Sequence, residues 1–237
     1  MEVIAVLFRV DKTSYTLSRQ QKDREIKMPS RLIEIFEDTR LVEKIKNRLP
    51  YLFQLAELES SRAGKTGMEV GSVRERIIVA LLIYKFGEAN VETNIPITEP
   101  EVDVKLFGEP ISIKTITGKS FGGVKLIWTV DAQKAKEFRE NYYPSCDILL
   151  IQINWNDVGG FYYIPLETQI NLFDRIGREN YIKLPKPGTN PRGVEISKEA
   201  LSSLVNDNMT RKIEINWQKT KVNFNPYKRW VDLWMED

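Results

Sequence analysis

The chain has 237 residues, of which 42% are hydrophobic and 29% charged, and its formal net charge is +2 at pH 7. It can therefore bury a sizeable core, and it is not a disordered chain. It contains no histidine and a single cysteine, which excludes Ser-His-Asp and Cys-His triads, histidine-based zinc sites and thiolate zinc clusters.

The distribution of charge is more informative than its sum. Lys and Arg outnumber Asp and Glu in residues 9–31 and 183–229, whereas the middle of the chain holds most of the acids. Basic flanks around an acidic centre suit a polyanion that the periphery holds and the middle acts on, although solvated surface charge gives the same pattern. As the single cysteine, Cys146 is expected to be a buried core residue without an internal disulfide, and one cysteine suits a cytoplasmic location. No apolar run is long enough to cross a membrane.

The N-terminal third is expected to be mainly helical. Residues 3–10 predict a strand, and residues 13–28 predict a basic loop. Apolar residues recur at near-helical spacing across residues 30–58, which predicts a helical region that Pro50 breaks or kinks. We therefore expect an N-terminal strand and helical lobe up to about residue 65.

A second helix is predicted over residues 72–86. Ser72 can cap it, and Glu75 stands at the capping-box position three residues later. The middle of this segment is apolar on every side, which predicts a buried helix, and Gly87 predicts its end. Glu75 is open to two interpretations, a capping residue only or a functional carboxylate on this helix.

Two short alternating runs, residues 101–106 and 111–116, flank a turn that contains Gly108 and Pro110. Alternation with a period of two on both sides of a turn predicts a β-hairpin. In that hairpin Asp103 and Lys114 share one face and lie close together. The pair could form a metal-dependent phosphodiester-cleaving centre, or it could be an ordinary cross-strand ion pair.

The remaining segments alternate between strands and helices. Strands are predicted over residues 91–97, 124–128, 147–155, 161–164 and 211–217, and helices over residues 130–142, 165–176 and 197–205. This order predicts a mixed central β-sheet flanked by helices, of the α/β or α+β class. We expect one domain over residues 1–237, in which the catalytic core and C-terminal DNA-binding elements begin near residue 70.

Without histidine, phosphodiester cleavage needs a metal ion to supply the nucleophile and to neutralise the phosphate. Mg²⁺ takes one or two carboxylates together with substrate and water oxygens. Asp103 and Glu75 are the candidate carboxylate ligands, and the carbonyl of Ile113 would lie beside them. Lys114 would orient the attacking water and counter developing charge.

The residues Pro100-Glu101-Val102-Asp103 and Ser112-Ile113-Lys114 resemble the motif of the PD-(D/E)XK nuclease superfamily, above all its type II restriction endonucleases. The resemblance implies a restriction-endonuclease-like fold and a Mg²⁺ cofactor. The proline does not directly precede the aspartate, and Ser112 stands where a second carboxylate is usual. Related enzymes with serine there complete the site with a distant glutamate, for which Glu75 is the candidate and Asp131 or Glu137 the alternatives.

Over a longer span the chain resembles the ThaI family of restriction endonucleases. The residues that carry this resemblance are E-V-D-V-K-L-F-G-E-P-I-S-I-K-T from Glu101, the strand Val124 to Trp128, Asn154-Trp155 and residues 188–194. The resemblance implies a homodimer that cuts double-stranded DNA at the palindrome CGCG to blunt ends.

DNA-contacting residues are expected outside the hairpin. Asn190 and Arg192 are the first candidates for reading bases, because arginine reads guanine through two parallel hydrogen bonds. Met28 could wedge between base steps or be a buried contact at the entry to a helix. Basic residues expected to touch phosphates, which position the duplex without specifying sequence, are Arg62, Lys65, Lys119 and Lys125.

Two alternatives to a restriction enzyme remain open at this stage. A structure-specific repair or junction nuclease of the same superfamily would cut only at branches or ends. A non-catalytic DNA-binding module would show salt-dependent binding to duplex DNA without cleavage under any divalent metal.

Overall fold

The computed structural model describes residues 30–62, 65–66, 69–96, 99, 101–185 and 193–236. The chain divides into two units, Met1–Ser30 and Arg31–Asp237, and the second contains every element discussed below. The strand expected over residues 3–10 and the loop expected over residues 13–28 lie outside the described residues. In the described part of the chain, no helix is long and apolar enough to cross a membrane.

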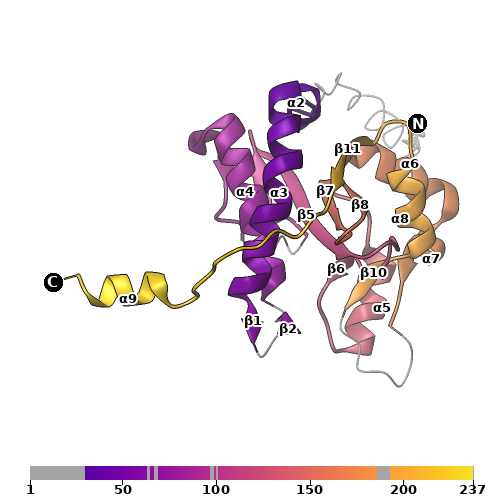
Figure 1. Cartoon of the computed structure of the whole chain (residues 1–237). Coiled ribbons are helices and arrows are strands. Elements are labelled where there is room, and N and C mark those ends of the chain that lie inside the picture. Colours follow the sequence, from indigo (N-terminus) through magenta and orange to yellow (C-terminus); the bar gives the residue numbers. More distant parts are fainter. Residues whose placement is uncertain are drawn as a thin grey trace, which may run out of the picture. The chain divides into compact units, whose positions relative to one another are not determined.

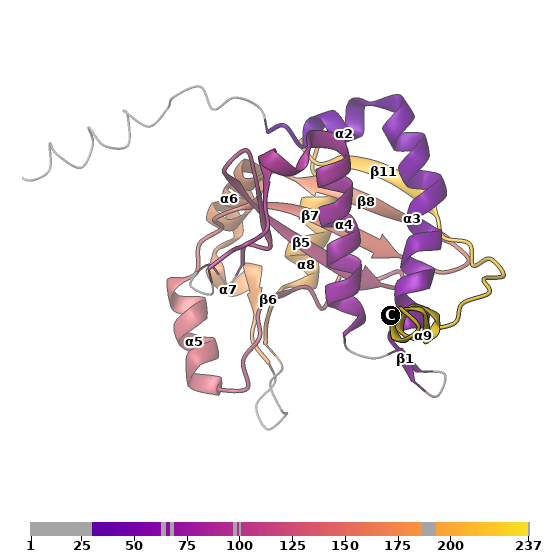
Figure 2. The same cartoon turned by 90° about the vertical axis from the view of Figure 1, so that its left-hand side faces the viewer.

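A mixed six-stranded sheet lies at the centre of the second unit, with the strand order β11-β8-β7-β5-β4-β3. β5 and β7 run parallel, with Lys114 opposite Leu150, and the other neighbouring strands are antiparallel. Figure 2 shows β11, β8, β7 and β5 side by side. The prediction of a mixed sheet flanked by helices is thus confirmed. The strands are β3 (Val91–Glu92), β4 (Val104–Leu106), β5 (Glu109–Thr117), β7 (Asp147–Ile153), β8 (Val158–Ile164) and β11 (Arg211–Asn216).

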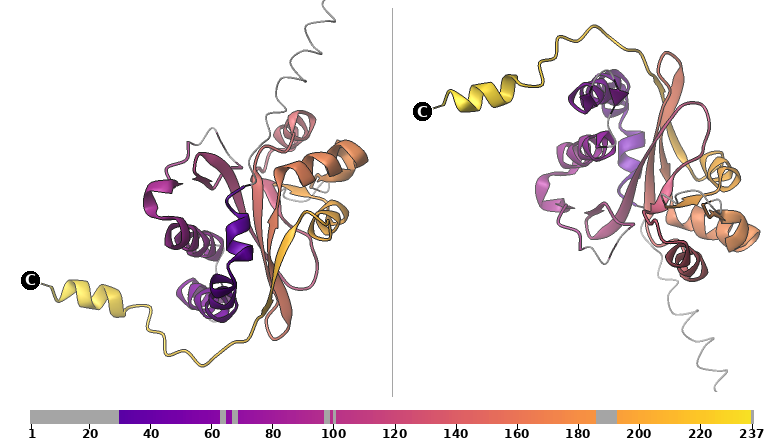
Figure 3. Two further views of the ribbon diagram at one scale, coloured as in Figure 1. Left: turned by 90° about the horizontal axis from the view of Figure 1, so that it is seen from above. Right: turned by 90° about the horizontal axis from the view of Figure 1, so that it is seen from below.

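Helices cover both faces of this sheet (Figure 3). One face packs against α2 (Ile33–Glu37), α3 (Thr39–Glu59) and α4 (Val70–Phe86), and the other packs against α6 (Leu166–Ile176), α7 (Arg178–Tyr181) and α8 (Lys198–Val205). Alternate strand residues point to opposite faces. Leu149 and Ile151 therefore belong to the first core cluster, and Ile148 and Leu150 to the second. β7 is buried along its whole length, as expected for a central strand.

Shorter elements surround the sheet (Figure 1). The strand expected over residues 124–128 is β6 (Lys125–Ile127), but it pairs with β10 (Val194–Ile196) in a separate sheet of order β6-β10-β9. β9 spans Ile182–Lys183. The other short elements are the hairpin of β1 (Ser61–Arg62) and β2 (Lys65–Thr66), the 3-10 helix η1 (Glu88–Asn90), α5 (Ala132–Asn141) and α9 (Lys228–Trp234).

Of the two expected effects of Pro50, a break or a kink, the break does not occur, because α3 runs through this residue from Thr39 to Glu59. A proline inside a helix removes one backbone hydrogen bond. Here Leu49 and Phe53 on either side are buried in the core, and this packing keeps the helix continuous. The chain breaks instead at Asp38, whose extended backbone separates α2 from α3 and whose carboxylate accepts a 3.0 Å hydrogen bond from the Leu41 amide.

Two expectations about α4 are also wrong. The helix begins at Val70, and its N-cap residue Glu69 makes no side-chain capping bond, so Ser72 and Glu75 lie inside the helix and form no capping box. The helix is not buried on every side either, because its buried residues are Arg74, Ile78 and Leu82. Gly87 ends the helix with a positive φ of 85°, as expected.

Candidate active site

The predicted hairpin is formed by β4 and β5, with Leu106 opposite Glu109. Phe107 and Gly108 have positive φ angles of 51° and 82°, which is the backbone of a tight type I′ turn. A positive φ is unfavourable for phenylalanine, but the Phe107 ring packs edge-on against Phe86 at 5.9 Å. Two-residue turns fix the strand register, and this register decides which side chains of the two strands meet.

Asp103 lies immediately before β4, and three donors converge on its Oδ2 atom. The Ile113 amide donates at 2.6 Å, the Ser112 hydroxyl at 3.2 Å and the Lys114 ammonium at 3.4 Å. The predicted pairing of Asp103 with Lys114 is therefore present. In the part of the chain that the structure describes, no donor is assigned to Oδ1, so one carboxylate oxygen remains free to act as a ligand.

Ser112 is almost completely buried, at 2% exposure. Its hydroxyl donates to Asp103 Oδ2, and it does not line the cleft described below. A serine in this place cannot bind a cation as the missing carboxylate would. It holds the carboxylate of Asp103 in one orientation.

Glu75 extends from α4 toward the same place. A cleft of about 790 Å³ is lined by Glu75, Asp103, Lys114 and the strand β6. Burial, followed by the negative charge of Asp103, raises the pKa of Glu75, and the positive charge of Lys114 opposes this. The two carboxylates therefore repel each other across the cleft. They are 28 residues apart in the sequence, and the fold brings them together.

The donor set of this cleft fits Mg²⁺. Two carboxylates and a backbone carbonyl are hard oxygen ligands. Ile113 lines the cleft, and because the N–H and C=O of one strand residue point the same way, its carbonyl lies on the side of Asp103, to which its amide donates. Among the described residues no group of three or more His, Cys, Asp or Glu forms a ready-made metal cage, and Mg²⁺ sites that use substrate oxygens do not need one.

The alternative carboxylates lie elsewhere. The carboxylate of Asp131 caps α5 by accepting from the amides of Gln133 and Lys134. Glu137 is exposed on α5 and accepts from Gln133 at 3.0 Å. Neither lines the cleft with Asp103, so Glu75 is the one of the three candidate carboxylates that does.

The predicted phosphate-contacting lysines differ in their surroundings. Lys125 lines the cleft, but it forms an ion pair with Glu195, and its ammonium lies 5.7 Å from the centre of the Trp128 ring. Lys119 is exposed, lies outside this cleft and pairs with Asp157 at 2.8 Å. The backbones of Arg62 and Lys65 pair in the β1–β2 hairpin. The side chains of Arg62 and Lys65, and all of Met28, Asn190 and Arg192, lie outside the described structure.

Sequence reasoning missed two residues that line the cleft, Arg74 and Trp128. Trp128 is 71% exposed at the end of β6. Arg74 is buried beside Glu75 on α4. A charged residue inside an apolar helix was the available signal for Arg74, because a buried guanidinium requires a partner.

That partner is Glu57 of α3, which accepts from Arg74 at 2.5 Å and from the Trp155 indole at 2.7 Å. Lys219 pairs with the same carboxylate at 3.3 Å. Burial lowers the pKa of Arg74, and the charge of Glu57 opposes this shift. The cluster ties α3, α4 and the segment after β11 together, and Arg74 is the neighbour of Glu75 on α4.

Replacing Glu57 with glutamine is expected to destabilise the protein by about 3 kcal/mol, because the buried guanidinium of Arg74 loses its countercharge. Urea denaturation of the variant measures this change in unfolding free energy. Glu43→Gln is the matched control: its ion pair with Lys46 is exposed, so its effect should stay below about 1 kcal/mol. Equal effects of the two substitutions would contradict a structural role for the cluster.

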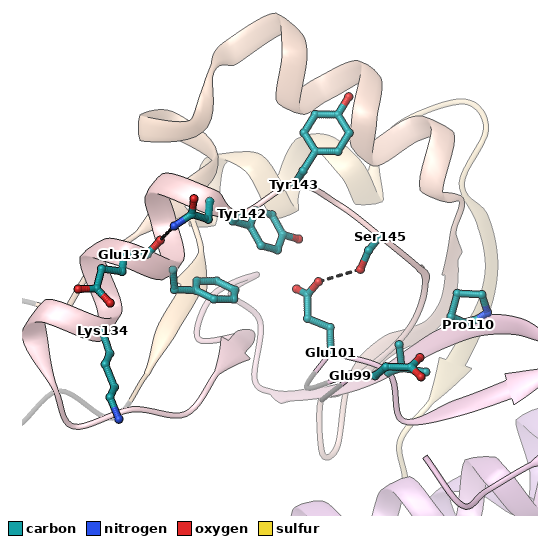
Figure 4. A pocket seen from close by; sticks show the side chains of 11 residues that line it. Glu99, Glu101, Pro110, Lys134, Glu137, Tyr142, Tyr143 and Ser145 are labelled. Carbon is teal, nitrogen blue, oxygen red and sulfur yellow. Dashed lines mark hydrogen bonds between the residues drawn. The ribbon is translucent and has the colours of Figure 1, made fainter. Parts of the chain in front are cut away.

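A second pocket, of about 650 Å³, lies next to the hairpin and is lined by Glu101 and Tyr142. Alternation predicted Glu101 on the face of Asp103, but β4 begins only at Val104. The Val102 amide instead donates to the Glu99 carbonyl in a turn. Figure 4 shows Glu101 bonded to Ser145, at 3.1 Å, with the Tyr142 ring nearby. Burial raises the pKa of Glu101 to about 7.

The comparisons with known proteins agree with this geometry. A family model described as "Restriction endonuclease ThaI" matches residues 35–236. A solved structure described as "Restriction endonuclease in complex with substrate DNA" is 64% identical, covers 88% of this chain and 100% of that chain, and has a TM-score of 0.83. A search of curated proteins finds no match. The matched span contains the hairpin, α4 and the cleft between them, and it confirms the predicted resemblance. The chain therefore belongs to the ThaI family of restriction endonucleases.

Proposed function

We propose that this restriction endonuclease uses Mg²⁺ to hydrolyse both strands of duplex DNA at a short G/C palindrome. The proposed site is CGCG, cut to blunt ends that carry a 5′-phosphate and a 3′-hydroxyl. As a member of its family the chain is a site-specific nuclease of the type II restriction class. The observation that carries the finer proposal is the meeting of Asp103, Lys114 and Glu75 in one cleft.

In this proposal Asp103, Glu75 and the Ile113 carbonyl hold the metal ion. When bound, Mg²⁺ neutralises phosphate charge and lowers the pKa of the attacking water. Lys114 lies at the same carboxylate, 3.4 Å from Asp103 Oδ2. Its ammonium donates hydrogen bonds to the attacking water and counters the charge that develops on the phosphate oxygens.

The other residues of the cleft position these groups. Ser112 and the Ile113 amide hold Asp103 Oδ2, which leaves Oδ1 for the cation. Arg74, the neighbour of Glu75 on α4, is held by Glu57 and fixes α4 relative to α3. Catalysis by positioned charges requires such fixed surroundings, because a group that must reorient during the reaction stabilises the transition state less.

Duplex DNA is the proposed partner, and the solved relative was described with its substrate DNA. The exposed Trp128 and the basic Lys125 at the rim of the cleft suit contact with a duplex. Arg62, Lys65 and Lys119 remain proposed phosphate contacts, Asn190 and Arg192 proposed base contacts, and Met28 a proposed wedge. A palindrome read by one kind of chain requires two copies, so we propose a homodimer.

A digest of linear DNA of known sequence tests this function. With Mg²⁺ we expect discrete fragments whose sequenced ends are blunt, carry 5′-phosphates and lie within CGCG. Chelation with EDTA should stop cleavage, and a matched DNA in which every CGCG is altered should stay intact. Cleavage only at branches or ends would instead indicate a structure-specific nuclease, and binding without cleavage under any divalent metal would indicate a non-catalytic module.

A further inference from the structure

The C-terminal helix α9 presents large apolar side chains to solvent. Trp230, Trp234 and Met235 are 57%, 90% and 77% exposed, and no residue of this helix, Lys228–Trp234, is buried. Trp230 and Trp234 are four residues apart and so share one face of the helix. An isolated helix of 7 residues is too short to be stable in water, and exposed aromatic patches of this kind mark protein interfaces.

A matching apolar groove lies between α3 and α4. The groove forms where the outer face of α4, which is only partly buried, meets α3, and it has a volume of about 340 Å³. Apolar surface makes up most of its lining, and the residues that supply it are Ile45, Leu49, Leu52, Ile77, Ala80 and Leu81. Lys44 and Arg48 lie along the α3 side of the groove.

Residues 220–236 form an arm that carries α9, and this arm is attached to the core at Thr220. Gln54 of α3 exchanges two hydrogen bonds with the backbone of Thr220, of 2.7 and 2.9 Å. Residues 221–226 that follow have no helix or strand, and when fully extended they can span at most roughly 20 Å. Figure 1 shows this segment leaving β11 and crossing α3, and Figure 3 shows α9 beyond both helices.

No hydrogen bond or ion pair joins α9 to any other helix or strand in the described part of the chain. The contacts of Lys228 and Arg229, for example, are with Asp232, Asn225 and Trp230 of the same arm. Among the described residues, the arm thus carries α9 away from the core with nothing covering the helix, and none of these residues covers the groove either. If two copies of the chain exchanged their arms, the apolar face of each α9 would be buried in the groove of the other copy.

We propose that α9 of one chain docks into the α3–α4 groove of a second copy, and that the two arms are exchanged reciprocally about a two-fold axis. Trp230 and Trp234 fill the groove. Glu236, at the end of the arm, faces Lys44 and Arg48 of the partner, while Asp232 keeps its ion pair with Lys228, so the end of the arm and this side of the groove carry opposite charges. The family match extends to residue 236, so the arm belongs to the matched span.

The exchange would also connect association with the cleft. α4 turns Glu75 toward the cleft and Ile77 and Leu81 toward the groove. A partner helix bound at the groove would hold α4 from outside and bring two clefts into one assembly. This inference rests on the homodimer in the proposed function. Its test measures association without DNA, so its failure is distinguishable from a failure of the nuclease proposal.

The test is sedimentation velocity of the full-length chain at micromolar concentration. The arm variant is Trp230→Ala with Trp234→Ala, and the groove variant is Ala80→Glu, at an exposed helical position. We expect a dimer for the unchanged chain and a rise in the dimer Kd of at least about 100-fold for each variant. Trp128→Ala, which removes an exposed tryptophan outside the arm, should leave the dimer Kd unchanged.

Mixing the two variants separates exchange from docking within one chain. A mixture contains one intact arm and one intact groove, so it should associate more tightly than either variant alone. A monomeric unchanged chain, or a dimer whose Kd neither variant changes, would overturn the proposal. A mixture no tighter than its components would also overturn it. Circular dichroism melting verifies that each variant is folded.

Discussion

Replacing Asp103 with asparagine is expected to lower the cleavage rate at least about 10³-fold, because the change removes the charge that is proposed to hold the cation and that pairs with Lys114. Asparagine keeps an oxygen that can accept the 2.6 Å hydrogen bond from the Ile113 amide, so the hairpin should remain folded. The measurement is a single-turnover cleavage assay with Mg²⁺ on DNA that carries the proposed site.

Asp174→Asn is the matched control for this substitution. Asp174 is exposed on α6 and contacts Tyr143 at 3.3 Å, outside the cleft. Its variant should cleave at the unchanged rate, and the Asp103 variant should still bind the duplex in the presence of Ca²⁺. Cleavage by Asp103→Asn within tenfold of the unchanged enzyme would mean that Asp103 and Lys114 are a structural ion pair.

Replacing Glu75 with glutamine is expected to lower the cleavage rate on the order of 10²-fold at low Mg²⁺, with partial recovery at high Mg²⁺. The physical reason is the shared cleft. Glu75 and Asp103 repel each other there and Lys114 offsets this only in part, and a divalent cation relieves the repulsion by binding both carboxylates. The neutral amide keeps the size of the side chain and loses this attraction.

Two measurements distinguish a metal ligand from a packing residue at position 75. The Mg²⁺ concentration that gives half-maximal cleavage should rise in Glu75→Gln, and calorimetric titration with Ca²⁺ in the presence of DNA should show weaker cation binding. Glu88→Gln, an exposed position just beyond α4, should change neither quantity. If Glu75→Gln lowers the rate equally at all Mg²⁺ concentrations, Glu75 is not a ligand.

The hairpin shows what local sequence can determine. A period of two assigns each strand residue to a face, and a tight turn fixes the register, so the approach of Asp103 to Lys114 follows from residues 103–114 alone. The absence of histidine then directs hydrolytic chemistry to a metal held by carboxylates. The buried position of Cys146 was readable in the same way, from the apolar run that it begins.

The helices show where local rules fail. Local propensity predicted a break or a kink at Pro50 and a capping box at Ser72, and burial in the shared core prevented the break. For α4, the chain enters the helix two residues earlier, which turns Glu75 from a capping position into a side chain of the cleft. Helix boundaries depend on a few hydrogen bonds, so tertiary packing can shift them at small cost.

The sequence by itself determined the sheet class and the hairpin pair, and its resemblance to the PD-(D/E)XK nucleases implied a second carboxylate in place of Ser112. Only the tertiary structure decided that Glu75, and not Asp131 or Glu137, lies in the cleft with Asp103. It also revealed the Glu57–Arg74 pair and the apolar groove between α3 and α4. The physical reason is range: alternation and turns act between neighbouring residues, whereas the meeting of a helix with a hairpin is set by how the whole core packs.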